Sequence, residues 1–462
     1  MSGGETLREF LRRAGYRPRQ LAHAVNARLE RRGLERNRID PSTPYHWLRH
    51  GYRPYEPVPQ IVAELIEERL GQRVTVGMLW PGREVEADQA REAGDGLAGP
   101  WSGDGTLRQL DELAGLGEVE RREYRAISGP PLINSALDGI VLTPSPVPAA
   151  LGAERVLPPM MDLLAGHIAA LRRLDDRQGG GALSLRYVTN ELQSVLDLVR
   201  SSSYSMDVGQ RLFTVVANLA QLAGWMHFDA GESGVAQRYF LLGLRAARAA
   251  GDKACAANIL GMLSYQAAHS GQPGEAVRLA EAAVSSAQPL DVTTRARIAG
   301  RLATAHASAG DVYGFRSASE AARDLWDRRG AESGPAFLYY FTAEQLAAES
   351  GQALVDLAKL NPGRGESLLA EATDLLKPLS NASLQADHQR SALLHGCYLA
   401  EAHLALGDIA GACAAVRAAL PRVPGVQSGR CAERLHGLRR ALKLRKRNKL
   451  VAEILPELER AL

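Results

Sequence analysis

Two asparagines and an arginine recur at intervals of about forty residues in the middle of the chain, at positions 218, 258 and 297. The side chains of Asn218 and Asn258 each carry a hydrogen-bond donor beside an acceptor, as is needed to hold the backbone of an extended peptide. Arg297 takes the equivalent position one interval later. The spacing therefore indicates a candidate binding position, with a structural role between helices as the alternative for each side chain.

The recurrence follows a larger pattern, in which a glycine and a polar residue separate two helical stretches. The dipeptides are Gly231-Glu232, Gly271-Gln272, Gly310-Asp311, Gly351-Gln352 and Gly407-Asp408. Glycine suits the left-handed residue that ends one helix and lets another begin soon after. Small side chains recur on either side of these glycines, where neighbouring helices must approach closely: Gly224, Ser264, Ala303 and Ala400, then Ala236, Ala276 and Ala412. The period predicts a stacked helical repeat.

On these residues, segment 160–430 resembles the tetratricopeptide repeat, with Phe315 where the family has a small side chain. The resemblance implies an α-solenoid in which the first helix of each pair lines a concave groove. Aromatic anchors among a few polar groups are typical of a ligand groove. The side chains expected to line it are Asn218, Gln221, Trp225, Phe228, Asp229, Asn258, Tyr265, His269, Arg297, Thr304 and Ser308. Packing between helices is the alternative for each, and His269 is interpreted as a polar wall residue rather than a catalytic base.

The composition favours a helical protein. Aromatic residues make up 5% of the 462 residues, while alanine, leucine and arginine are abundant, so we predict an all-α chain of two or three domains. The four cysteines are dispersed and are interpreted as core residues in a reducing compartment. The N-terminus has no apolar signal segment, and no run of eighteen apolar residues occurs. We therefore expect a cytoplasmic protein without a membrane partner.

Residues 1–83 predict a unit of short helices, at about 6–15, 17–29, 39–49 and 57–70, closed by segment 74–82. The second helix has its apolar stripe at Leu21, Ala22, Val25 and Leu29. Fifteen arginines, no lysine and nine acidic residues give the unit a charge of +6. Such an excess favours contact with phosphate groups, and a solvated basic face is the alternative.

This unit resembles the lambda-repressor-like helix-turn-helix domain, in its short helices and in Trp47 just ahead of the glycine turn at Gly51. The connector 31–38 is longer than the family's tight turn. The resemblance implies a third helix that lies in the major groove of DNA. We assign Ile39, Trp47 and Leu48 to the core. The candidate DNA contacts are Ser42, Thr43, Tyr45, His46 and Arg49 on the third helix, and Arg19, Gln20, Arg38 and Arg53 as phosphate contacts.

The rest of the chain is interpreted as a linker, the array and a cap. Residues 84–159 are rich in glycine, proline and acids, and predict a partly disordered linker with little core of its own, helical only near 106–126. Residues 160–430 form the array, and 431–462 predict basic capping helices. The basic run 439–449 could instead add non-specific affinity for DNA.

Over nearly its whole length outside the linker, the chain resembles the actinobacterial helix-turn-helix/TPR regulators that control development and antibiotic production. The stretches that carry this resemblance are 173–181 (RLDDRQGGG), 222–226 (LAGWM), 236–240 (AQRYF) and 266–269 (QAAH). The domain order is also similar to that of quorum-sensing regulators whose repeat domain binds a peptide. We interpret the three glycines at 179–181 as a hinge, because no strand precedes them and no lysine-serine or lysine-threonine pair follows.

These observations predict a transcriptional regulator that binds double-stranded DNA, as a homodimer, so that two reading helices meet two half-sites. Its array would bind a peptide, a small metabolite or a protein partner, and the ligand would bias the curvature of the solenoid and the spacing of the DNA-binding domains. The alternative is an adaptor that sequesters another regulator without binding DNA. The sequence has no Walker loop, HExxH motif or nucleophile elbow, so we expect no enzyme, no cofactor and no metal.

Overall fold

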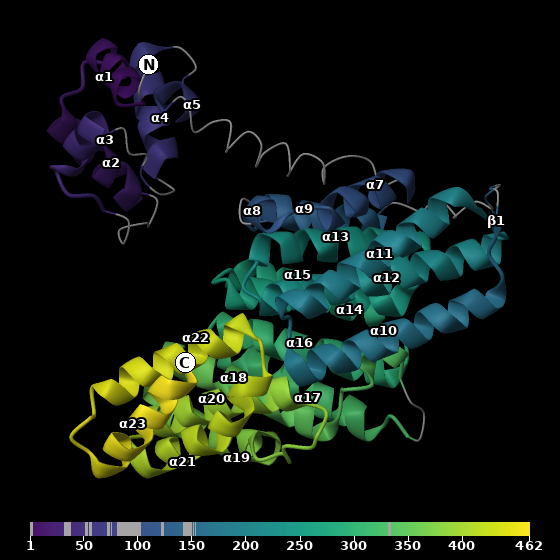
Figure 1. The fold of residues 1–462 in the computed structure, drawn as a ribbon. Helices are drawn as coiled ribbons and strands as arrows, with labels where there is room; N and C mark the ends of the chain where they lie inside the picture. Colours follow the sequence, from purple (N-terminus) through teal and green to yellow (C-terminus); the bar gives the residue numbers. More distant parts are fainter. Residues whose placement is uncertain are drawn as a thin grey trace. The chain divides into compact units, whose positions relative to one another are not determined.

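The computed structural model describes residues 3–31, 38–50, 54, 58–71, 74, 76–80, 103–121, 124–141, 150, 152, 154–330 and 334–462. The chain forms two compact units, Met1–Asp95 and Gly96–Leu462. They are called the N-terminal unit and the array unit below, and Figure 1 draws the helices of both.

The described part of the N-terminal unit consists of short helices around one core. They are α1 (Gly3–Arg13), α2 (Pro18–Arg31), α3 (Thr43–His50), α4 (Val58–Leu70) and α5 (Val76–Leu79). The predicted stripe of the second helix is buried in full. Trp47 of α3 packs edge-on against Trp80, with ring centroids 6.2 Å apart. The predicted helices and the assignment of Trp47 to the core are therefore confirmed.

Polar contacts hold both the segment just before α3 and the last turn of α3. The side-chain amide of Asn26 on α2 donates to the carbonyl oxygen of Ile39 and accepts from the amide N–H of the same residue, both at 2.9 Å. At the other end, Arg8 Nη2 of α1 donates to the carbonyl oxygen of Leu48 at 3.1 Å. These contacts therefore hold α3 in a defined place against α1 and α2.

The array unit is built from antiparallel helix pairs. Its main helices are α10 (Pro158–Gln178), α11 (Ala182–Ser201), α12 (Met206–Asp229), α13 (Ser233–Ala249), α14 (Lys253–His269), α15 (Pro273–Ala287), α16 (Val292–Ser308), α17 (Val312–Asp327), α18 (Ala343–Leu360), α19 (Gly365–Ser380), α20 (Gln389–Ala405), α21 (Ile409–Ala419), α22 (Gly429–Lys443) and α23 (Lys449–Ala461). The first helix of each pair, from α12 to α18, packs on the helix that follows it and also contacts the first helix of the next pair. In the same way, α20 packs on α21 and contacts α22. This solenoid-like packing confirms the predicted helical repeat.

Four of the five repeat glycines end helices as predicted. Gly231, Gly271, Gly310 and Gly407 have φ angles between +71° and +90°, which glycine adopts without strain. Gly351 differs, because it lies inside α18, where an added Cβ atom would come within 2.8 Å of Leu376 on α19. The helix end expected at Gly351 is therefore wrong, and this glycine permits close approach of the paired helix instead.

Residues 103–141 do not behave as the expected linker. They contain α7 (Gly103–Ala114), α8 (Glu118–Arg121) and α9 (Pro130–Val141), and α7 and α9 pack on α13. Leu107, Leu110 and Leu113 of α7 are buried in the same core as the array helices. The three leucines form one helical stripe, and the array supplies the apolar surface that covers it. The stretches 84–102 and 142–149 of the expected linker lie outside the described residues.

A short strand pair and a long-range contact join segments that are distant in sequence. The strands β1 (Glu154–Arg155) and β2 (Ser202–Ser203) pair in parallel, an element that the all-α prediction missed. Helix α10 packs on α20, and the amide N–H of Gln427 donates to the carbonyl oxygen of Gln178 at 2.6 Å. The beginning of the array therefore meets its last helices. None of the helices in the described ranges is both long and apolar enough to cross a membrane.

The packing of α7 predicts a large cost for truncating its central leucine. Leu110→Ala should lower the free energy of unfolding by about 2–5 kcal/mol, because Leu110 is fully buried. Urea unfolding followed by tryptophan fluorescence measures this change. The matched control is Leu183→Ala on α11, since Leu183 is 66% exposed and its truncation should change the free energy by less than about 0.5 kcal/mol. Equal, small effects of both substitutions would show that α7 does not belong to the folded array.

Candidate functional site

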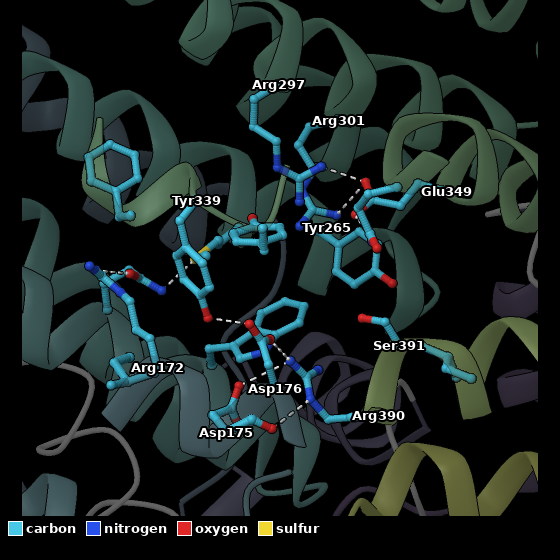
Figure 2. A pocket seen from close by; sticks show the side chains of 18 of the residues that line it. Arg172, Asp175, Asp176, Tyr265, Arg297, Arg301, Tyr339, Glu349, Arg390 and Ser391 are labelled. Atoms are coloured by element: carbon cyan, nitrogen blue, oxygen red, sulfur yellow. Dashed lines mark hydrogen bonds and ion pairs between the residues drawn. The ribbon is translucent and has the colours of Figure 1, made fainter. Parts of the chain in front are cut away.

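The array unit contains a cavity of about 70 Å³ that is lined by residues of α10, α12, α14, α16, α18, α20 and α22 and of the segment 337–340. Figure 2 shows its side chains from close by. A water molecule needs roughly 10–15 Å³ when volume is measured in this way. The cavity is therefore large enough for several waters or for one small polar group of a ligand.

Four of the predicted groove residues line this cavity: Gln221, Trp225, Tyr265 and Arg297. Phe228 is buried behind them and contacts both Trp225 and Tyr265, at ring-centroid distances of 5.9 Å and 6.0 Å. The ring of His269 lies tilted against that of Tyr265, with centroids 4.1 Å apart, and burial lowers the pKa of its imidazole to about 4. These aromatic side chains of α12 and α14 therefore form one cluster beside the cavity.

The other predicted groove residues take different positions. The Asn218 Oδ1 atom accepts from Arg172 Nη2 at 2.8 Å, and its Nδ2 atom donates to the carbonyl oxygen of Thr214 at 2.8 Å. Asn258 and Thr304 are buried but do not line the cavity, and the Thr304 and Ser308 hydroxyls donate to carbonyl oxygens of their own helix. The equivalence of Asn218, Asn258 and Arg297 in the repeat thus does not bring all three side chains to one surface.

Arg390 of α20 is the centre of a buried ion-pair cluster. Its Nη2 atom lies 3.0 Å from Asp175 and 3.1 Å from Asp176 at the end of α10, and its Nη1 atom lies 3.8 Å from Asp229 of α12. Burial raises the pKa of the Asp175 carboxyl to about 7, against the attraction of Arg390. Burial also acts to raise the pKa of Asp176, but hydrogen bonding with His388 and the Arg390 charge leave it below its usual value. Asp229, predicted as a groove residue, therefore belongs to this cluster.

A second buried cluster lies on α16 and α18. Arg297 Nη1 is 2.5 Å from Glu349 Oε2, and Arg301, one helical turn further along α16, is 3.7 Å from the same oxygen. Burial acts to raise the pKa of Glu349, but the two guanidinium groups outweigh it and hold the pKa at about 2. Glu349 is therefore ionised at neutral pH, and it is shared between two arginines.

The arginines of the cavity lie against aromatic rings. The Arg301 guanidinium is 4.0 Å from the centre of the Tyr265 ring, and the Arg430 guanidinium is 4.9 Å from Phe228 and 5.4 Å from Trp225. Arg430 also donates to the Tyr265 hydroxyl at 2.9 Å. An aromatic face stabilises a nearby cation by about 0.5–2 kcal/mol, most strongly where water is excluded. The rings thus hold the guanidinium groups in a buried site.

Sequence reasoning missed most of the charged residues of this site: Arg172, Asp175, Asp176, Arg301, Glu349, Arg390 and Arg430. Arg301 lies four residues after Arg297, so helical spacing alone places it on the face that was already proposed. Asp175 and Arg390 are 215 residues apart, and no local pattern connects them. The glycines at 179–181 also have a different role from the expected hinge, because an added Cβ on Gly180 would lie 2.4 Å from the carbonyl oxygen of Met226.

The candidate DNA contacts lie in the N-terminal unit. Tyr45, at 49% exposure, and Arg49 are exposed on α3, while Trp47 between them is buried. Arg19, Gln20 and Arg38 are exposed, and Thr43 is half-buried.

Several of these side chains already have partners. The Ser42 hydroxyl donates to the Asp40 carboxylate at 2.6 Å, and Gln20 Oε1 accepts from the amide N–H of Arg17 at 3.0 Å. Arg38 lies 4.0 Å from Glu30. The side chain of His46 and the whole of Arg53 lie outside the described residues.

The comparisons with known proteins cover the chain unevenly. A family model described as the SP15 N-terminal domain matches residues 7–79, a span that contains most of α1 and all of α2 to α5. No curated protein matches the chain. Among solved structures, the chain is similar at 17% identity to a "circular tandem repeat protein with novel repeat topology and enhanced subunit contact surfaces", over 99% of this chain and 97% of that one, with a TM-score of 0.18. Since that score is too low to equate the folds, the repeat architecture rests on the helix packing described above.

The pKa of Asp175 predicts a pH-dependent difference in stability. The folded state raises this pKa from 3.8 to about 7, so Asp175 stabilises the fold most at low pH and loses that contribution as the pH rises to 7. Relative to Asp175→Asn, the parent chain should lose up to about 1.4 kcal/mol of unfolding free energy per pH unit in this window. The groups that act on Asp175, namely Arg390, Asp176, Asp229 and Arg430, are present in both chains.

Urea unfolding of both chains between pH 4 and pH 8 measures this difference. The control is Asp162→Asn on the same helix, since the Asp162 side chain is 83% exposed. Its curve should run parallel to that of the parent chain. Parallel curves for Asp175→Asn as well would contradict the raised pKa.

Proposed function

We propose that the chain is a DNA-binding transcriptional regulator, in which the N-terminal unit binds double-stranded DNA and the array unit binds a ligand that controls this binding. The observation that carries the proposal is the division of α3 into two faces. Trp47 is only 3% exposed, whereas Tyr45 is 49% exposed and Arg49 is also exposed. A helix with one face in the core and an exposed face with an arginine and an aromatic residue suits insertion into the major groove.

The charges of the N-terminal unit support this proposal. Its first 83 residues carry fifteen arginines and nine acidic residues. Some of these charges compensate one another, because Arg28 of α2 lies 2.6 Å from Glu68 and 3.5 Å from Glu64 on α4. Arg19 and Arg49 form no ion pair with another described residue, so their guanidinium groups are available to phosphate or to guanine.

The fixed position of α3 also supports a reading role. Specific recognition requires a helix that is held in place before it meets DNA, since any ordering on binding lowers the affinity. The Asn26 amide and the Arg8 guanidinium hold the start and the end of the α3 segment through backbone atoms. These two contacts leave the exposed side chains of α3 free for DNA.

Control by the array unit is the second part of the proposal. The arginine-lined cavity is the candidate ligand site, and a ligand that favours one shape of the array would bias how two N-terminal units of a homodimer are spaced. The resemblance of the stretches 173–181 and 222–226 to actinobacterial regulators supports genes of development or secondary metabolism as the targets.

The test is enrichment of sheared genomic DNA from the encoding organism on the full-length chain, with Tyr45→Ala, Arg49→Ala as the double variant. The parent chain should enrich a palindromic motif, and the variant should lose it, because each lost base contact weakens binding by about 1–3 kcal/mol. The control is Arg12→Ala, an exposed arginine of α1. This variant should still enrich the motif, and its affinity for DNA should fall by no more than the loss of one phosphate contact causes.

The salt dependence of binding separates the possible outcomes. A DNA-binding protein that neutralises several phosphates loses affinity steeply as salt rises, with a slope that scales with the number of contacts. Enrichment that survives in the double variant would place the DNA contacts outside α3. A parent chain without enrichment or salt-dependent DNA binding would refute the regulator and favour the adaptor that sequesters another protein.

A further inference from the structure

Arg301 is a buried cation without a hydrogen-bond acceptor. It is 3% exposed, and among the described residues its guanidinium group donates no hydrogen bond. Its ion pair with Glu349 is long, at 3.7 Å, and that carboxylate is already bound by Arg297 at 2.5 Å. A buried polar group normally has a partner, because leaving it without one costs more free energy than a typical hydrogen bond contributes. Arg301 Nη1 is thus a buried donor beside the cavity that has no acceptor among the described residues.

Two further arginines of the cavity have no carboxylate partner within the part of the chain that is described. Arg172 of α10 donates to the neutral amide oxygens of Asn218 and Gln221, at 2.8 Å and 3.0 Å. Arg430 of α22 donates to the Tyr265 hydroxyl, and its Nη1 atom is buried without an acceptor. All three arginines line the same cavity, and Figure 2 shows Arg172 and Arg301 on different sides of it.

The charges around the cavity do not balance. The cations are Arg172, Arg297, Arg301, Arg390 and Arg430, and the acids among or directly behind the lining residues are Asp175, Asp176, Glu349 and Asp229. The cations exceed the acids by one if every acid is ionised, and by two when Asp175 binds a proton. Because an uncompensated buried charge is costly, the cavity favours an occupant with one or two negative charges.

We infer that this cavity binds a small dianion with phosphate or carboxylate oxygens, through Arg172, Arg301 and Arg430. Arginine suits both groups because its planar fork matches their oxygens. The cavity of about 70 Å³ has room for such a group. The inference deepens the ligand-sensing half of the proposed function and rests on it only for its biological role.

The ligand would bring together three parts of the array. Arg172 comes from the first helix of the array, Arg301 from the middle, and Arg430 from the helix that follows the last repeat pair. A dianion that accepts hydrogen bonds from all three would therefore favour the closed arrangement of α10, α16 and α22. This is the differential affinity that a ligand needs in order to shift an equilibrium between two shapes.

The test is isothermal titration calorimetry of the full-length chain with inorganic phosphate, succinate and the neutral diamide succinamide, at constant ionic strength. One of the two dianions should bind saturably at one site per chain, and which of them binds identifies phosphate or carboxylate as the preferred group. Succinamide should not bind. Arg301→Met should weaken the binding at least tenfold, and Arg430→Lys should also weaken it, because lysine keeps the charge but loses the fork.

Matched measurements keep the result independent of folding. Arg328→Met is the control, since the Arg328 side chain is 74% exposed, and it should bind the dianion like the parent chain. Without ligand, Arg301→Met should unfold at the same or a higher urea concentration than the parent chain, because it removes a buried charge whose hydrogen bonds are unmade.

Two outcomes would overturn the inference. One is the absence of saturable dianion binding in the parent chain, which would leave ordered water as the acceptor for these arginines. The other is equal dianion binding by Arg301→Met and the parent chain. Both are measured without DNA, so they are separate from the DNA enrichment: a chain that binds the dianion but no DNA refutes only the regulator, and the reverse result refutes only the dianion site.

Discussion

The closed array depends on the buried ion pairs of Arg390. This one side chain joins Asp175 and Asp176 at the end of α10 to Asp229 at the end of α12, from its place on α20. Removing one partner of a buried ion pair typically costs about 3–5 kcal/mol, since the remaining charges are left without compensation. The cavity exists only while α10 lies against α20, so its lining depends on a contact between segments that are far apart in sequence.

The sequence predicted those parts of the fold that local patterns encode. The apolar stripe at Leu21, Val25 and Leu29 and the helix-ending glycines at 231, 271, 310 and 407 follow from helical period and backbone freedom alone. Residues 103–141 were harder to interpret, because a leucine stripe among glycines and prolines has no defined role until its partner surface is known. Gly351 shows the same difficulty, since close helix packing and a left-handed turn both select glycine.

The candidate site was predictable only in part. Trp225, Tyr265 and Arg297 lie on first helices of successive repeats, and the repeat register therefore brings them to one cavity. Arg390 and Arg430 come from the far end of the chain, and their position depends on how the array closes. The Asn218 amide, expected to clamp a peptide, is already bonded to Arg172 and Thr214. Its oxygen accepts one hydrogen bond and its nitrogen donates one within the protein, so Asn218 is not free to clamp a peptide in the way that its spacing suggested.

The same charges that favour an anion also oppose closure when the cavity lacks one. Arg301 lies close enough to Arg297 for that charge, in addition to burial, to lower the pKa of its guanidinium, and Glu349 serves both arginines. Arg390 holds the closed arrangement, whereas the one or two positive charges that exceed the acids around the cavity oppose it. A ligand that only occupied an already stable cavity would transmit little, because it could not change the balance between two shapes. The proposed dianion would supply negative charge at the place where the ends of the array meet, and it would thereby favour the closed arrangement.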